Sequence, residues 1–167
     1  VLPLVAMRLV AEERQTGSIE VLLASPVSAR ELATGKLLGA AVFYLALLAP
    51  FPLFLAVLAA VGRLDLAAAA AGLGGLVLVG TYLLAACLLA SASTRNQVVA
   101  AALGFVLLVA LFTLPLAARA IAASPAARAG WDQLDLVATM DEFSRGFVAA
   151  RRLVYPLTGT VLFTVLA

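Results

Sequence analysis

The sequence predicts an all-α, polytopic membrane helix bundle, and three observations support this fold class. Hydrophobic residues make up 65% of the 167 residues and charged residues only 12%, whereas a soluble domain is about half apolar and about a quarter charged. The mean hydropathy is +1.14. Three uncharged runs are each long enough to cross a bilayer. A soluble core of this size cannot enclose so much apolar surface, so lipid must surround much of the chain.

The first two runs are joined by a short hairpin at residues 61–65. The first, Leu37–Val61, has 25 residues and as a helix would reach about 37 Å, more than the roughly 30 Å hydrocarbon core. We expect it to tilt or bend, and Pro50 and Pro52 indicate where. The second run is Leu66–Ala90. Among its alanines it carries glycines that allow neighbouring helices to approach closely: Gly72, Gly74, Gly75 and Gly80.

The third run is Val98–Ala118, and the charge on Arg119 marks its end. A polar turn precedes it, in which Thr94 and Gln97 fit a capping box. Two partial spans flank the three runs: residues 1–7 as the end of a membrane helix and residues 153–167 as the start of the last one. Both chain ends resemble cut ends, so we expect a fragment of a longer membrane protein, lacking the amino-terminal membrane region and the end of the last helix.

Residues 119–152 are expected to form a loop with a helix lying at the membrane interface. Thr139 and Glu142 fit another capping box, and Asp141 and Arg145 have the spacing of an i,i+4 ion pair. An apolar stripe runs along this helix, made of Leu136, Met140, Phe143 and Phe147. Two roles stay open for the helix, packing at the interface and a lid over an exit path.

The charged segment 8–36 is the most informative part of the sequence. Its charges would each cost roughly 3 kcal/mol at the bilayer centre, so it lies outside the membrane. Gly17 ends one helix, Ser18 caps a short amphipathic helix, and Pro26 stops it. Ser28 and Glu31 then form a capping box for the next span. A short surface helix between two membrane helices is predicted, and an ordinary solvated loop is the alternative.

Composition excludes several function classes. The chain has no histidine, which removes His-based catalytic triads, His metal sites and His-dependent membrane proteases. Its one cysteine, Cys87, is interpreted as a small buried hydrophobic residue. The net charge of +2 gives no reason to expect nucleic acid as a partner. No P-loop motif occurs. We expect no catalytic, cofactor or metal site.

Charge alone does not orient the chain. Five Lys and Arg residues lie on one side of the predicted spans and six on the other, so the positive-inside rule does not decide. One span, Leu66–Ala90, separates Arg63 from Arg95, which places these two residues on opposite sides of the membrane.

Three patches resemble ABC-2 type permeases, especially the gliding-motility and copper-processing branch. The first is AEERQTGSIEVLLASPVSARELATGKLL at residues 11–38, with its acidic-acidic-basic start, its Gly, its Ser-Pro-Val-Ser and its Gly-Lys. The second is the turn at residues 91–100. The third combines residues 141–147 with residues 153–155. Together they span nearly the whole chain in the right order.

The resemblance implies six membrane helices per subunit and a multi-pass protein of the inner (cytoplasmic) membrane. Segments 8–36 and 91–97 would be cytoplasmic, and 119–152 external. The implied partners are a separate ABC ATPase subunit, a second permease subunit (homo- or heterodimer) and the lipid bilayer. The chain would be a transport subunit and not itself an enzyme. The alternative is a membrane scaffold or assembly protein without a transport path.

The segment 8–36 would then be the loop that couples the permease to the ATPase. The residues expected to make this contact are Glu12, Glu13, Gly17, Ile19, Glu20, Leu22, Leu23 and Pro26.

Overall fold

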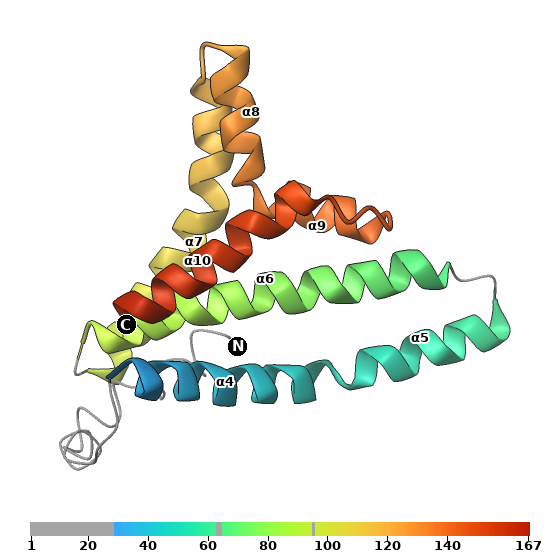
Figure 1. Ribbon diagram of the computed structural model, residues 1–167, viewed down its shortest axis with the longest axis horizontal. Coiled ribbons are helices and arrows are strands. Elements are labelled where there is room, and N and C mark those ends of the chain that lie inside the picture. The colour runs from blue at the N-terminus through green and yellow to red at the C-terminus, as the bar shows by residue number, and fades with distance from the viewer. Residues whose placement is uncertain (1–28, 63–64, 95) are drawn as a thin grey trace. The chain divides into compact units, whose positions relative to one another are not determined.

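The computed structural model describes residues 29–62, 65–94 and 96–167 of the chain. Within these residues all regular elements are helices, and no strand occurs. The helices are drawn in Figure 1: α4 (Ala29–Leu48), α5 (Pro50–Val61), α6 (Leu66–Ala92), α7 (Gln97–Ile121), α8 (Pro125–Gln133), α9 (Leu136–Ser144) and α10 (Ala150–Leu166). The predicted fold class, an all-α membrane helix bundle, is confirmed.

Three helical segments are long and apolar enough to cross a membrane: Glu31–Val61, Leu66–Ala92 and Gln97–Ile121. They contain the three uncharged runs of the sequence. Burial differs among them, since 61% of the most apolar stretch of α6 is buried, against 17% in α7 and 6% in Glu31–Val61. The helix α6 therefore supplies most of the packed interior, while the other two segments leave their apolar side chains for lipid or for other helices to cover.

The first of these segments is interrupted where proline was expected to bend it. Helix α4 ends at Leu48 and α5 begins at Pro50. Proline has no N–H to donate and its ring clashes with the preceding turn, so the regular bonding pattern fails here. The Ala49 N–H donates instead to the Ala46 carbonyl over 3.2 Å, a tighter turn than in an α-helix. No residue of α5 is buried.

The chain divides into two compact units, and each is described by itself. The first comprises Val1–Val42, Thr81–Ala110 and Thr158–Ala167. Its described core is the second half of α6, where Tyr82 and the residues 83–88 are buried. The rings of Tyr82 and Phe163 stack with their centroids 5.5 Å apart. Cys87 is buried and free, in agreement with its interpretation as a small hydrophobic residue.

The second unit comprises Phe43–Gly80 and Leu111–Leu157. Here small residues of α6 receive the bulky side chains of its neighbours. The ring of Phe143 on α9 lies against Gly75, and the ring of Tyr44 on α4 lies against Gly80. The Tyr44 hydroxyl also donates to the Leu76 carbonyl over 3.0 Å. The expected close approach of helices at the α6 glycines is thus seen at Gly75 and Gly80.

Gly74 departs from this expectation, because a side-chain carbon placed there would meet nothing within 4 Å. Gly74 instead lines a small apolar cavity of about 210 Å³ between α6 and the α4–α5 break. Gly146 has a different role. It follows α9 with a φ of +83°, the left-handed region that glycine adopts without strain, and it lies against Ala68 of α6.

Two predicted capping boxes are wrong, and in each case a better acceptor lies close by. Helix α7 is capped by Asn96, whose side-chain oxygen accepts from the Val98 N–H at 2.9 Å. Thr94 accepts from the Asn96 N–H, outside the helix. The predicted box of Ser28 and Glu31 includes Ser28, which lies outside the described residues.

Helix α9 is capped by Asp135, whose carboxylate accepts from the N–H groups of Val137 and Ala138. Thr139 lies inside the helix, where its hydroxyl donates to the Asp135 carbonyl. Asp and Asn are at least as good as Thr at an N-cap, and each of them stands directly before its helix. Of the expected stripe, Leu136 and Phe143 are buried, but Phe147 lies beyond the helix and is exposed.

The contact between Gly75 and Phe143 yields a matched pair of substitutions. A Cβ added at Gly75 would lie 2.7 Å from Cγ of Phe143, so Gly75→Ala must displace α9, and we expect the melting temperature of the purified chain to fall by roughly 3 °C. Gly74→Ala adds the same methyl group where no neighbouring atom lies within 4 Å. This variant should keep or raise the melting temperature, because alanine favours the helical conformation. Equal shifts for the two variants would contradict the packing described here.

Candidate functional site

The residues expected to contact an ATPase all precede Ala29 and lie outside the described residues. They are Glu12, Glu13, Gly17, Ile19, Glu20, Leu22, Leu23 and Pro26. The described residues instead contain a polar site in the second unit, built from the ends of α7, α8 and α10 and from α9.

The centre of this site is the guanidinium group of Arg152, at the start of α10. Its side chain is only 3% exposed. It binds Glu142 Oε1 at 2.8 Å and Asp132 Oδ2 at 2.9 Å, and it also donates to the Asp132 carbonyl. One buried cation thereby joins α8, α9 and α10, and its charge is balanced by carboxylates from two of these helices.

Arg119 extends the site to α7. Its Nη1 lies 3.1 Å from Asp132 Oδ1 and 3.5 Å from Asp135 Oδ2. Asp132 therefore bridges Arg119 and Arg152 with its two oxygen atoms. Asp135 uses its other oxygen to cap α9. Arg119 stands in the last turn of α7, where a positive charge is favourable beside the free carbonyl groups of a helix end.

Exposed ion pairs surround this buried centre. Arg151 lies 3.7 Å from Glu142, with most of its side chain exposed. The expected i,i+4 pair of Asp141 and Arg145 is present at 2.8 Å, also well exposed. Such surface pairs contribute little to stability, so the buried contacts of Arg152 dominate the energetics of the site.

The environment of Arg152 alters the acid–base behaviour of its partner. The hydrogen bond from Arg152 holds the pKa of Glu142 below its usual range, and the positive charges of Arg152 and Arg151 add to the effect. The same hydrogen bond raises the pKa of Arg152. Both groups are thus held in their charged forms, and neither is suited to give or take a proton near neutral pH.

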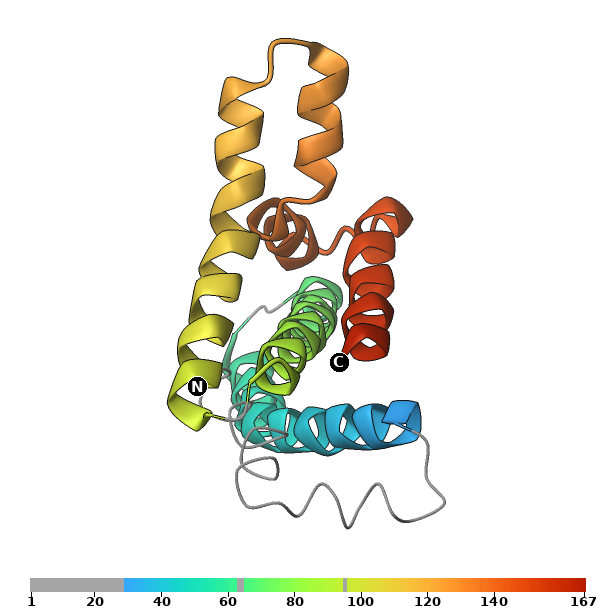
Figure 2. The same ribbon diagram turned by 90° about the vertical axis from the view of Figure 1, so that its left-hand side faces the viewer.

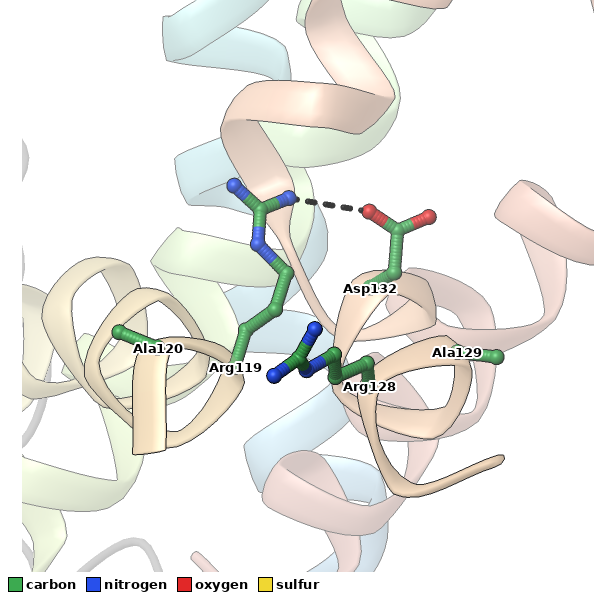
Figure 3. Close-up of a pocket in the computed structure, with 5 residues that line it drawn as sticks. All are labelled: Arg119, Ala120, Arg128, Ala129 and Asp132. Atoms are coloured by element: carbon green, nitrogen blue, oxygen red, sulfur yellow. Dashed lines mark hydrogen bonds and ion pairs between the residues drawn. The ribbon is translucent and has the colours of Figure 1, made fainter. Parts of the chain in front are cut away.

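An open pocket of about 550 Å³ lies beside this cluster, between α7 and α8. The two helices run antiparallel next to each other (Figure 1 and Figure 2). The pocket is lined by Arg119, Ala120, Arg128, Ala129 and Asp132. Figure 3 shows the side chains of Arg119 and Arg128 reaching into the same space, with Asp132 opposite Arg119.

These groups supply two guanidinium groups with their hydrogen-bond donors, and one carboxylate, Asp132, that is already paired with Arg119 and Arg152. Among the described residues, no group of three or more His, Cys, Asp or Glu side chains could hold a metal ion. The arrangement can fasten helices together and can bind an anion.

Sequence reasoning missed Arg152, Asp132 and Asp135 as structural residues. A usable signal was present, because the stretch from Asp132 to Glu142 contains four acidic residues, these two included, and two adjacent arginines precede the last apolar run. Such a balance of opposite charges next to an apolar run indicates ion pairing.

Comparison with known protein families gives a match over most of the chain. The model of the ABC-2 family transporter protein matches residues 3–141. The chain belongs to the ABC-2 transporter family. ABC-2 family members are membrane subunits of ABC transporters, a class that works together with ABC ATPase subunits. The match includes the segment predicted to contact an ATPase and the helices α4 to α8. No match was found among curated proteins or among solved structures.

The lowered pKa of Glu142 predicts how stability depends on pH. As pH falls, the unfolded chain protonates this carboxyl first, near its ordinary pKa of about 4.3. The contribution of Glu142 is therefore complete above that value and is lost as pH falls through the lower pKa of the folded chain. We expect Glu142→Gln to lower the melting temperature by a constant amount above about pH 5, and the difference from the parent chain to shrink in more acidic buffer.

The matched control is Asp141→Asn, which removes a neighbouring carboxylate from an exposed pair. It should change the melting temperature little at neutral pH. A deficit for Glu142→Gln that persists unchanged to pH 3 would show that the ionised carboxylate is not what stabilises the site.

Proposed function

We propose that this chain is the membrane-spanning permease subunit of an exporter in the inner (cytoplasmic) membrane, driven by ATP that a separate ATPase subunit hydrolyses. The family match over residues 3–141 carries the proposal, and the three apolar helices agree with it. The three sequence patches support placement in the gliding-motility and copper-processing branch. A second permease subunit would complete the transporter, and the exposed apolar surface of α4, α5 and α7 is available for lipid or for that subunit.

The coupling element in this proposal is the segment from Gly17 to Pro26. On the predicted short helix, Ile19, Leu22 and Leu23 form one apolar face that a groove on the ATPase would accept. Glu12, Glu13 and Glu20 would surround the contact and orient it. Force applied here would enter α4 almost directly, because α4 begins at Ala29 and the helical segment continues to Val61 with one break.

The proposed orientation places residues 8–36 and 91–97 on the cytoplasmic side, next to the ATPase. Residues 119–152, which include α8, α9 and the buried charges around Arg152, would then lie on the external side. In that position the ion cluster would hold the external ends of α7 and α10 together through α8 and α9, while the cytoplasmic segment receives the push from the ATPase.

The apolar face of the predicted coupling helix is tested with Leu22→Asp. The charge would prevent that face from entering an apolar groove, so we expect loss of the ATPase from co-purification, or loss of transport-linked ATP hydrolysis in lipid. The measurement uses the purified protein together with any ABC ATPase that a neighbouring gene encodes. Val21→Asp is the matched control, because Val21 lies on the opposite face of the predicted helix, and it should retain both properties.

Insertion and the melting temperature of both variants are measured in parallel, so that misfolding is separated from uncoupling. Full partner binding and stimulated hydrolysis by Leu22→Asp would remove the coupling role from this face. A chain that inserts normally but binds no ABC ATPase in any variant would instead be a membrane scaffold or assembly protein.

A further inference from the structure

We propose that the pocket between α7 and α8 binds the phosphate of an anionic lipid headgroup. This α7–α8 pocket, lined by Arg119, Ala120, Arg128, Ala129 and Asp132, is separate from the predicted coupling segment. The proposal needs the chain to lie in a membrane, but it does not depend on the ATPase or on the transported substrate.

The first observation is an uncompensated positive charge. Residues 111–157 are all described, and there each acidic side chain is paired with an arginine. Arg128 is the one arginine of this stretch without an ion pair. Its Nε donates to the Ala122 carbonyl over 2.9 Å, which fixes the direction of the side chain. Both terminal nitrogen atoms of Arg128 are left to bind a ligand.

Arg119 supplies the second guanidinium group. Among the described residues its hydrogen bonds use only Nη1, which is directed to Asp132 and Asp135, so its other nitrogen atoms are available in the pocket. The negative charge of Asp132 does not oppose an incoming anion strongly, because Arg119 and Arg152 already neutralise it. Two guanidinium groups in one open space repel each other unless an anion lies between them. Phosphate oxygens suit the planar fork of arginine donors.

The position of the pocket points to a lipid as the source of the phosphate. Arg119 lies in the last turn of α7, a helix long and apolar enough to span a membrane, and the end of a span is the level of the headgroups. Next to it, Ile121 is 82% exposed, and Trp131 on α8 is 39% exposed. Tryptophan is enriched at both membrane interfaces, and arginine donors at the level of the headgroups can bind a lipid phosphate. A soluble anion has no apolar part that could contact these side chains, whereas a lipid has one.

The test uses Trp131, which is the only tryptophan of the chain and lies three residues from Arg128. The full chain is placed in phosphatidylcholine nanodiscs, and energy transfer from Trp131 to dansyl-labelled lipid is measured. Dansyl-phosphatidylglycerol should saturate the signal at about one-tenth of the mole fraction that dansyl-phosphatidylcholine needs, the gain expected for one charge-assisted contact.

Arg128→Gln should abolish this roughly tenfold preference. Arg128→Lys keeps the charge and should retain part of it. Arg145→Gln is the matched control, because it removes the same charge from the same segment. Arg145 is exposed and paired with Asp141 outside the pocket. The lipid preference of the Arg145→Gln variant should therefore match that of the parent chain. Melting temperatures confirm that each variant is folded. A preference that survives in Arg128→Gln, or that falls equally in both glutamine variants, would overturn the site.

A competition experiment with a soluble anion identifies the source of the phosphate. Inorganic phosphate at millimolar concentration is added at constant ionic strength, with sodium chloride as the reference. We expect no displacement of dansyl-phosphatidylglycerol, because the soluble ion lacks the apolar part of the ligand. Displacement by phosphate and not by chloride would show that the pocket takes a soluble anion, and the assignment to lipid would be wrong.

Discussion

The buried guanidinium group of Arg152 is the constraint on which the arrangement of α8, α9 and α10 depends. A charge taken out of water is costly, and it is tolerated only when its hydrogen-bonding groups find well-placed partners. Arg152 satisfies this requirement with Glu142, the Asp132 carboxylate and the Asp132 carbonyl. These partners come from two separate short helices, so the requirement can be met only when both helices are docked. If α8 or α9 moved away from the start of α10, the guanidinium group of Arg152 would lose a partner.

Apolar contacts in the second unit hold α9 in addition to the ion pairs of Arg152. Phe143 fits against Gly75, and Gly146 takes a left-handed conformation that brings the chain against Ala68. The contacts with α6 therefore lie on one side of α9, and the ion pairs join α9 to its other neighbours. Neither set alone explains why a helix as short as α9 is ordered, since isolated helices of this length are unstable in water.

The sequence was sufficient to predict the fold class, the positions of the long helices and the break at Pro50, because these follow from uncharged length and from the chemistry of proline. It was not sufficient for the local caps. Thr94 and Thr139 fit a capping pattern, yet Asn96 and Asp135 stand nearer the helix starts and bind the backbone instead. Gly74 and Gly75 are adjacent in sequence, but only Gly75 faces a neighbouring side chain, and composition does not reveal which face of α6 packs.

The contacts of Arg152 could not be predicted residue by residue, because its partners lie 10 and 20 positions away on other helices. Periodicity within one helix carries no information about such pairs. The predicted coupling segment, unlike the contacts of Arg152, is supported by the sequence and not by the described structure. It rests on the sequence pattern and on membership of the ABC-2 family, and it precedes the described residues. The described structure contributes the helix that begins directly after it.

The central structural claim is that Arg152 fastens α9 to its neighbours, and hydrogen exchange of the α9 backbone tests it most directly. Arg152→Ala is compared with Arg151→Ala, which removes an adjacent arginine that is 64% exposed. For Arg152→Ala we expect exchange of the α9 amides to accelerate by about tenfold or more, because Glu142 and Asp132 lose a buried partner. Arg151→Ala should leave α9 protected. Unchanged protection of α9 in Arg152→Ala, or equal acceleration in both variants, would contradict the claim.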